Sequence, residues 1–192
     1  MKKIAVLIII FSFFSASFAQ SRKEIRAERK AKLEADFSKT KDLITSNNFM
    51  FEANWATPLG NDVANISRNF IGGNAVFQGN RVNLSSNTNF IKITDTTADV
   101  FLPYFGRVFF PTRNPNDTGI AYKGDIENYS VDINEKKKHI LIKWEANPDG
   151  DNIQFIMKIN ASGYATVGVN SMRRQNITYN GNIKSIAKVN AN

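Results

Sequence analysis

The 192-residue chain contains no cysteine and a single histidine. Without cysteine it can form no disulfide and has no residue to which an N-terminal lipid could be attached, so we expect it not to be a lipoprotein. One histidine and no cysteine are too few for the usual zinc sites. His139 would also have to serve as the base of any Ser-His-Asp centre, yet it directly follows three lysines. We therefore expect no metal, no cofactor and no nucleophilic catalytic centre.

Long apolar runs are also scarce, and the clearest one is Ile4–Phe14. It is shorter than the roughly 20 apolar residues that a membrane-spanning helix needs. A charged start precedes it, and the small residues Ser17 and Ala19 follow it. This pattern is typical of a secretory signal peptide over residues 1–19, cleaved before Gln20. We predict a periplasmic or extracellular protein with no transmembrane segment after cleavage.

Positive charge dominates the segment after the predicted cleavage site. The chain has a formal net charge of +8, and residues 22–41 hold eight Lys or Arg and four Asp or Glu. Basic segments can bind nucleic acid, but the predicted export argues against that partner. We expect either a solvated helix face or a contact with an anionic component of the cell envelope.

The same segment has the composition of a helix, rich in Ala, Glu, Lys and Arg and free of Gly and Pro. We predict a charged helix over residues 20–46. Its second half carries Leu33, Phe37, Thr40 and Ile44 at helical spacing. The helix is therefore expected to have an exposed start and a docked end.

From residue 47 the hydrophobic period changes from helical to two, which is typical of strands. Phe49, Phe51, Ala53 and Trp55 fall on one face. Residues 57–79 are rich in Gly and irregular, with one short strand expected around Ala75–Phe77. From Tyr129 onward the alternation is regular, and Asn, Asp and Gly occupy the intervening turns. The inward faces are predicted to include three sets, namely Tyr129, Val131 and Ile133; Ile140, Ile142 and Trp144; and Ile153, Phe155 and Met157.

These patterns predict a mainly β domain over residues 47–192. The C-terminal half reads as an antiparallel meander with one face buried. Short, evenly spaced strands of this kind occur in barrels and sandwiches. We expect a single antiparallel β-barrel or curved sandwich, preceded by one α-helix.

The run "DVFLPYFGRVFFP" at residues 99–111 is the most aromatic of the predicted domain. Val100 and Leu102 alternate with apolar neighbours, so such a strand is either buried on both faces or lies near an apolar cavity. Two interpretations remain open for the residues after it. In the structural one, Arg107 stacks on Tyr104 or Phe105, or pairs with a carboxylate. In the functional one, Phe101, Tyr104, Phe105 and Arg107 form the rim of a ligand-binding site.

Several motifs resemble an uncharacterised family of exported proteins of Bacteroides-like Gram-negative bacteria, the domain-of-unknown-function family 4251. The most distinctive are LPYFGR at 102–107 and IENY within GDIENYSVDINEKKK at 124–138. The similarity continues through WEANPDGDNIQF at 144–155, SGYATV at 162–167 and ITYNG at 177–181. Residues 57–79 look longer than the corresponding segment of that family. The resemblance implies an exported β-rich domain and implies no activity.

Three functions are compatible with these observations. The first is a non-catalytic envelope protein that binds a small apolar or amphipathic ligand on its β-scaffold. The second is a structural protein whose basic helix contacts the envelope or a partner. The third is a hydrolase that uses two carboxylates across a cleft, drawn from Glu52, Asp99, Asp125, Glu127, Asp132 and Glu145. We expect the first, and no enzyme activity, because most of these acids suit solvent-facing partners of lysines.

Overall fold

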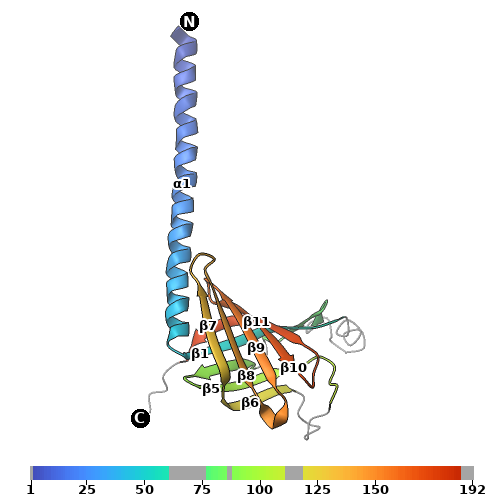
Figure 1. The fold of residues 1–192 in the computed structure, drawn as a ribbon. Coiled ribbons are helices and arrows are strands. Elements are labelled where there is room, and N and C mark those ends of the chain that lie inside the picture. Colours follow the sequence, from blue (N-terminus) through green and yellow to red (C-terminus); the bar gives the residue numbers. More distant parts are fainter. Residues whose placement is uncertain (1, 61–76, 86–87, 111–118, 187–192) are drawn as a thin grey trace.

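The computed structural model describes residues 2–60, 77–85, 88–110 and 119–186. One long helix, α1 (Lys2–Thr45), precedes a sheet that occupies most of the remaining chain (Figure 1). A single turn of 3-10 helix, η1 (Pro148–Gly150), lies between two of the strands. The strands are β1 (Asn48–Pro58), β2 (Phe77–Gln78), β3 (Arg81–Asn83), β4 (Phe90–Thr94), β5 (Thr97–Pro103), β6 (Gly119–Asp125), β7 (Glu127–Asn134), β8 (His139–Ala146), β9 (Ile153–Asn160), β10 (Tyr164–Ser171) and β11 (Ile177–Ser185).

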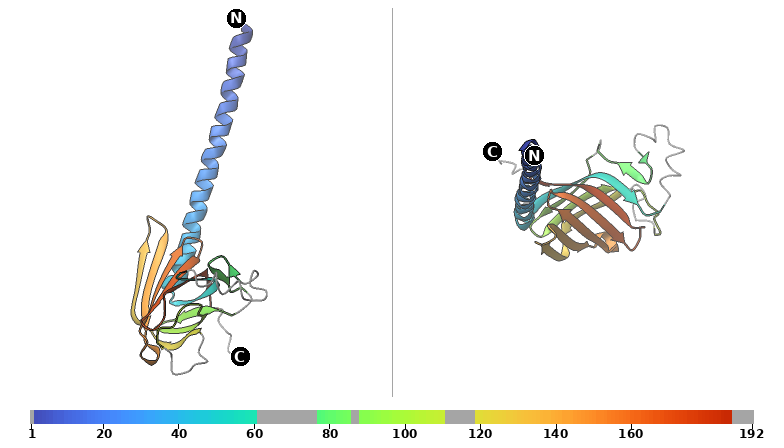
Figure 2. Two further views of the ribbon diagram at one scale, coloured as in Figure 1. Left: turned by 90° about the vertical axis from the view of Figure 1, so that its right-hand side faces the viewer. Right: turned by 90° about the horizontal axis from the view of Figure 1, so that it is seen from above.

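The strands form one antiparallel sheet in the order β6-β5-β4-β1-β11-β10-β9-β8-β7, with the short β2 and β3 attached beside β1. Only Ile126 separates β6 from β7 along the chain. One nearly continuous stretch therefore supplies both ends of the sheet, and the sheet curls round until it almost closes (Figure 2). The prediction of a mainly β fold with one N-terminal helix is confirmed, and its architecture is barrel-like.

The interior of the barrel is filled by side chains from the alternating positions that the sequence indicated. Every second residue of β8, β9 and β10 is buried along most of each strand, which confirms the predicted meander. Trp144 and Phe155 face each other across β8 and β9, with stacked rings 4.9 Å apart at centroids. Both are fully buried. Burying a large apolar side chain contributes about 1.5–3 kcal/mol, so this layer provides much of the stability.

Trp55 departs from the predicted inward face of β1. Phe49, Phe51 and Ala53 are buried as expected, but the pairing with β11 shifts between Ala53 and Trp55. This bulge reverses the phase, so Ala56 is buried and Trp55 is only half-buried. Gly181 lies opposite the bulge, where a Cβ would come within 1.9 Å of a β1 carbonyl oxygen. The close approach of the two backbones therefore requires glycine.

Strand β7 also differs from the prediction. Tyr129 and Ile133 are half-buried and Val131 is exposed, although alternation placed all three on a buried face. The reason is position in the sheet, because β8 is the only described strand with which β7 pairs. A strand at the end of a sheet has neighbours on one side, so its inward residues are covered incompletely.

The last turns of α1 dock against the hairpins that face them. Phe37 and Ile44 are fully buried, and the Thr40 hydroxyl donates to the carbonyl of Ala161 at 2.9 Å. Leu33, which was expected on the docked face, is 46% exposed. It lies one turn before Phe37, where α1 contacts the barrel through the neighbouring Glu34 instead.

Two ion pairs join α1 to the turn between β7 and β8. Lys41 Nζ lies 2.6 Å from Glu135 Oε1, and Lys138 Nζ lies 2.6 Å from Glu34 Oε2. The hydrogen bond and charge of Glu135 raise the pKa of Lys41, and Lys41 lowers the pKa of Glu135. The ammonium of Lys138 also lies 5.1 Å from the ring centroid of Phe37. These contacts orient the helix, although exposed pairs add little stability.

The irregular segment 57–79 is described only at its two ends. Phe77–Gln78 forms β2, which overlaps the short strand expected around Ala75–Phe77, and residues 61–76 lie outside the described residues. Within the described part of the chain, no helix combines the length and hydropathy that crossing a membrane requires.

Candidate ligand-binding site on the outer face of the sheet

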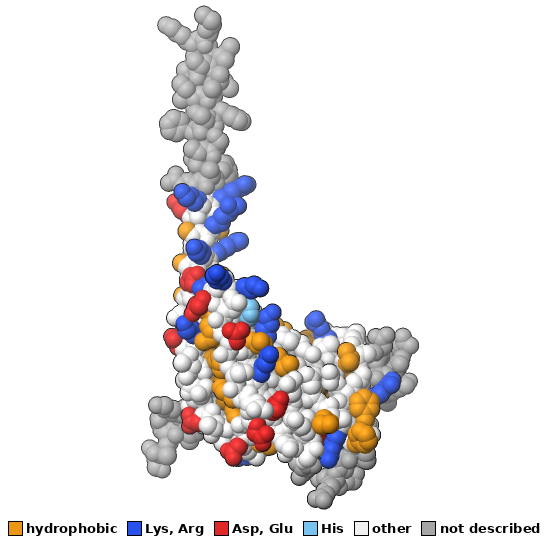
Figure 3. Space-filling model, viewed as in Figure 1, with side chains coloured by type: hydrophobic (Ala, Val, Ile, Leu, Met, Phe, Trp, Pro, Cys, Tyr) orange, Lys and Arg blue, Asp and Glu red, His pale blue; other side chains and the backbone are white. Residues whose placement is uncertain are grey.

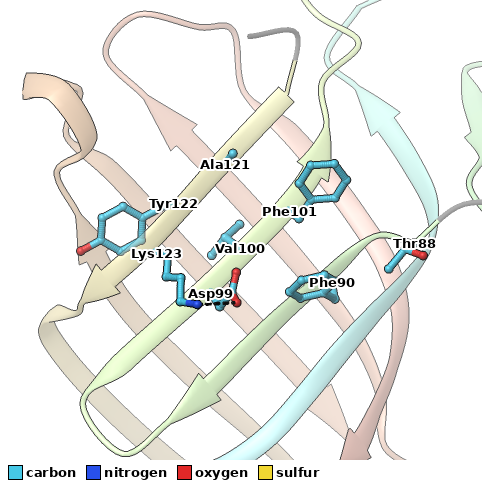
Figure 4. Close-up of a pocket in the computed structure, with 8 residues that line it drawn as sticks. All are labelled: Thr88, Phe90, Asp99, Val100, Phe101, Ala121, Tyr122 and Lys123. Atoms are coloured by element: carbon cyan, nitrogen blue, oxygen red, sulfur yellow. Dashed lines mark ion pairs between the residues drawn. The ribbon is translucent and has the colours of Figure 1, made fainter.

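A hollow of about 580 Å³, open to solvent, lies over strands β4, β5 and β6. Its lining combines the rings of two Phe and one Tyr, one ion pair, and small or aliphatic side chains (Figure 4). Most of the lining residues project from the outer face of the sheet, opposite the buried core. The residues are Thr88, Phe90, Asp99, Val100, Phe101, Ala121, Tyr122 and Lys123.

The apolar part of the hollow is a cross-strand aromatic pair. Phe90 of β4 and Phe101 of β5 are direct partners in the antiparallel register. Their ring centroids are 6.4 Å apart and their planes are tilted by 32°. Phe101 is 55% exposed, so much of this pair remains available for contact with another apolar surface. Ala121 lies beside Phe101 on β6 and leaves space above the rings.

The polar part of the hollow lies one pair further along the same strands. Asp99 of β5 and Lys123 of β6 are register partners, and Lys123 Nζ lies 3.9 Å from Asp99 Oδ2 (Figure 4). The Lys123 side chain is mostly exposed and can move to a ligand. Lys92 adds a second ammonium, 5.5 Å from the Phe90 ring centroid. Two cations and one carboxylate thus border the aromatic pair.

The residues after β5 form a structural clamp. The Tyr104 ring folds back over Gly106, where a Cβ would lie 2.4 Å from the Tyr104 hydroxyl. That hydroxyl lies 2.8 Å from the carbonyl oxygens of both Arg107 and Gln175. Arg174 places its guanidinium 5.4 Å from the ring centroid. Partial burial raises the pKa of Tyr104, so the hydroxyl stays protonated and can donate.

The same device recurs at the end of β6. The Tyr122 hydroxyl donates to the carbonyl of Asp125, three residues later, and a Cβ on Gly124 would lie 2.9 Å from that hydroxyl. Tyr122, Gly124 and Asp125 therefore have the same spacing in sequence as Tyr104, Gly106 and Arg107. In both places a tyrosine closes over a glycine where the chain leaves a strand. The distinctive glycine of LPYFGR is therefore explained by packing.

The structure places the four residues predicted to bind a ligand in different surroundings. Phe101 lines the hollow, whereas Tyr104 and Phe105 pack against the core. Arg107 is exposed, and its backbone carbonyl accepts from the Gln175 amide at 2.9 Å. The cation over the Tyr104 ring is Arg174, a buried residue that sequence reasoning did not consider.

The acids and the histidine do not assemble into a recognisable centre among the described residues. Asp151 is their one buried carboxylate, and it accepts hydrogen bonds from the Ser171 hydroxyl at 2.8 and 2.9 Å. Glu52 pairs with Lys184, and Glu145 accepts from Asn128 and Gln154. Across the described ranges, no group of three or more His, Cys, Asp or Glu could hold a metal ion.

The protein is thus a barrel-like β-domain with a helix docked at one corner and an open apolar hollow on its outer face. The family model described as a domain of unknown function, DUF4251, matches residues 31–183. The chain therefore belongs to this family. No curated protein matches it.

A solved structure has the same fold. It is the crystal structure of a DUF4251 family protein from Bacteroides eggerthii DSM 20697 at 1.95 Å resolution, with a TM-score of 0.52 and 17% sequence identity. The match covers 79% of this chain and 88% of that chain. At this identity the likeness concerns the fold alone.

Proposed function

We propose that the protein is an exported, non-catalytic envelope protein that binds an amphipathic ligand in the outer hollow. The observation that carries this proposal is the half-exposed aromatic pair of Phe90 and Phe101 beside the cations of Lys92 and Lys123. The rings would contact the apolar part of the ligand. The ammonium groups would contact an anionic head, with Lys123 leaving Asp99 to do so.

The outer face is favoured over the barrel interior because core side chains fill the interior. Val100 and Leu102 of β5 point inward and are buried, while Phe101 between them points outward. An exposed phenyl ring on a strand costs solubility, and exposed aromatic clusters often mark binding surfaces. The proposed ligand therefore lies on the sheet and not inside it.

Export is part of the proposal and depends on the N-terminal pattern. Residues 1–19 combine a charged start, an apolar run and small residues at the cleavage positions. After cleavage, α1 would begin near Gln20 and keep the docked turns around Phe37, Thr40 and Ile44.

A second candidate function is an interaction through the helix. Residues 22–35 of α1 are exposed and carry six Lys or Arg against three acids. Such a helix could bind an anionic envelope component. Replacing Arg26, Arg29 and Lys30 by Gln should then abolish retention on anionic envelope polymers without changing binding in the hollow.

The hollow is tested by titrating dodecanoate, dodecyltrimethylammonium and dodecyl maltoside below their micelle concentrations, with binding followed by calorimetry. We expect dodecanoate to bind best because its head is anionic. Phe101→Ser should weaken its binding at least about tenfold, the effect of losing about 1.4 kcal/mol of contact. Lys123→Gln should weaken dodecanoate selectively.

The matched control is Tyr164→Ser, which removes a comparably exposed aromatic ring from β10, on another part of the sheet. It should leave binding unchanged. Equal affinities of the wild type and Phe101→Ser would contradict the proposal, as would the absence of any binding in the wild type.

A further inference from the structure

A second apolar surface lies at the end of the sheet where β1 finishes. Five of the ten large hydrophobic side chains that are exposed among the described residues gather there, each 50–74% exposed. We call this group the apolar tip. In Figure 3, hydrophobic side chains gather at the right-hand end of the sheet, with Lys or Arg side chains beside them. The tip comprises Leu59, Val108, Phe109, Phe110 and Met172.

Backbone hydrogen bonds hold its three chain segments together. The amide of Phe109 donates to the carbonyl of Arg173 at 2.8 Å, and the amide of Leu59 donates to the carbonyl of Asn176 at 3.3 Å. The side-chain amide of Gln175 donates to the carbonyl of Leu59 at 2.8 Å. The apolar side chains are thus presented by an ordered backbone, next to the Tyr104 clamp.

Positive charge borders the tip. Arg107 directly precedes Val108, and Arg173 directly follows Met172. Arg81 is near as well, because the side chain of the preceding Asn80 donates to the carbonyl of Pro58 at 3.1 Å. Of these arginines, Arg81 and Arg107 are exposed. Cationic side chains therefore lie beside the apolar side chains of the tip.

The composition of the tip helps to identify its occupant. Taking about 200 Å² for a fully exposed side chain of this kind, the five residues present on the order of 600 Å² of apolar surface. A few inserted apolar side chains and a cationic rim suffice for interfacial binding to a lipid bilayer. The tip has both, because the exposed Arg81 and Arg107 lie beside its apolar side chains.

We propose that the apolar tip is a docking surface for a bilayer with anionic headgroups. Phe109, Phe110 and Met172 would enter the boundary between headgroups and acyl chains. The neighbouring arginines would lie at the level of the lipid phosphates. This surface is separate from α1, since the 11 residues of β1 lie between them, about 35 Å of extended strand.

The test uses a fluorescent reporter on the tip. Because the chain has no cysteine, Met172→Cys can be labelled at one position with the environment-sensitive dye NBD. Vesicles of phosphatidylcholine and phosphatidylglycerol (3:1) should shift its emission to the blue. Lipids carrying a nitroxide on the acyl chain should quench it. In the full chain, the apolar run at residues 4–14 can bind every variant to the vesicle. Binding alone would therefore not test the tip. The dye at position 172 reports insertion of the tip itself.

Several controls make the result specific. The label at Tyr164→Cys, exposed on β10, should not respond. With the label at 172, the double substitution Phe109→Ser and Phe110→Ser should reduce the response at least about tenfold, while Phe101→Ser should leave it unchanged. Pure phosphatidylcholine vesicles and 0.5 M NaCl should each weaken it, as expected for an electrostatic contribution.

Other outcomes would overturn the proposal. A silent label at 172 on sedimented vesicles would mean that the tip stays in water. An equal response at 164 would mean non-specific adsorption. A response that grows with protein concentration without vesicles would mean that a second copy covers the tip. Because Phe101→Ser acts on the hollow alone, failure of this proposal is distinguishable from failure of the proposed ligand site.

Discussion

Trp144 offers the sharpest test of the fold. Its side chain is fully buried, stacks on Phe155 and belongs to the middle of the meander. Truncating a buried Trp to Ala removes both the transfer free energy and the packing around the cavity, about 3–5 kcal/mol. The stacked pair adds about 0.5–1.5 kcal/mol. One effect opposes this loss. Trp144 Nε1 is buried without a hydrogen-bond partner among the described residues, which destabilises the wild type, and truncation to Ala removes that penalty. We expect a net loss of about 3–5 kcal/mol.

Urea unfolding followed by far-ultraviolet circular dichroism measures this loss without depending on Trp fluorescence. For a domain of this size, 1 kcal/mol corresponds to roughly 2–4 °C, so the expected loss should lower Tm by roughly 6–20 °C. Trp144→Phe should cost less than about 2 kcal/mol, because it keeps an aromatic ring against Phe155 and removes the unbonded N–H. Tyr164→Ala, on the exposed face of β10, should stay within about 0.5 kcal/mol of the wild type. A loss below about 1 kcal/mol for Trp144→Ala would refute the assignment of Trp144 to a tightly packed core.

Three further predictions follow from other parts of the molecule. Mass spectrometry of the mature protein isolated from its own cells should find a terminus at or near Gln20, and a form that retains residue 1 would contradict export. Arg174→Ala should lower the free energy of unfolding by about 2–3 kcal/mol, because its buried guanidinium donates to a β6 carbonyl and lies over the Tyr104 ring. Arg107 is exposed, so Arg107→Ala should cost about 1 kcal/mol or less. Equal losses of the two variants in urea titrations would contradict the clamp. Burial raises the pKa of Tyr179 far above its ordinary value, so stability should be full below about pH 10 and fall at higher pH, and Tyr179→Phe should flatten that dependence in a pH series of melting curves.

Hydrophobic alternation predicted the strands well wherever each strand has two neighbours and an uninterrupted register. The C-terminal hairpins satisfy both conditions, so Trp144, Phe155 and Met157 were placed correctly. Trp55 was misplaced because a bulge changes the phase by one residue, and nothing in the alternating pattern of β1 marks the extra residue. Val131 was misplaced because burial at the end of a sheet depends on strand order, which local periodicity does not contain.

The candidate site was predictable only in part, for a similar reason. Phe101 was predicted as a site residue because it belongs to the aromatic run at residues 99–111. Its partner Phe90 lies on the preceding strand, and their contact depends on the register of the β4–β5 hairpin. The clamp depends on Arg174, which is distant in sequence from Tyr104. The aromatic run itself divides among three roles, since Phe101 lines the hollow, Phe105 packs on the core and Phe109 projects at the tip.

The pairing of β1 with β11 has a consequence for the order in which the chain can fold. The first strand of the barrel lies in the middle of the sheet, between β4 and the last strand. At about 5–20 residues per second, the ribosome delivers β11 on the order of ten seconds after β1. During that interval β1 can pair with β4 but lacks its other neighbour, and the barrel cannot close. A nascent chain of this topology stays incomplete until synthesis ends, which keeps it open to chaperones and, if it carries a signal peptide, suited to translocation as an unfolded polypeptide.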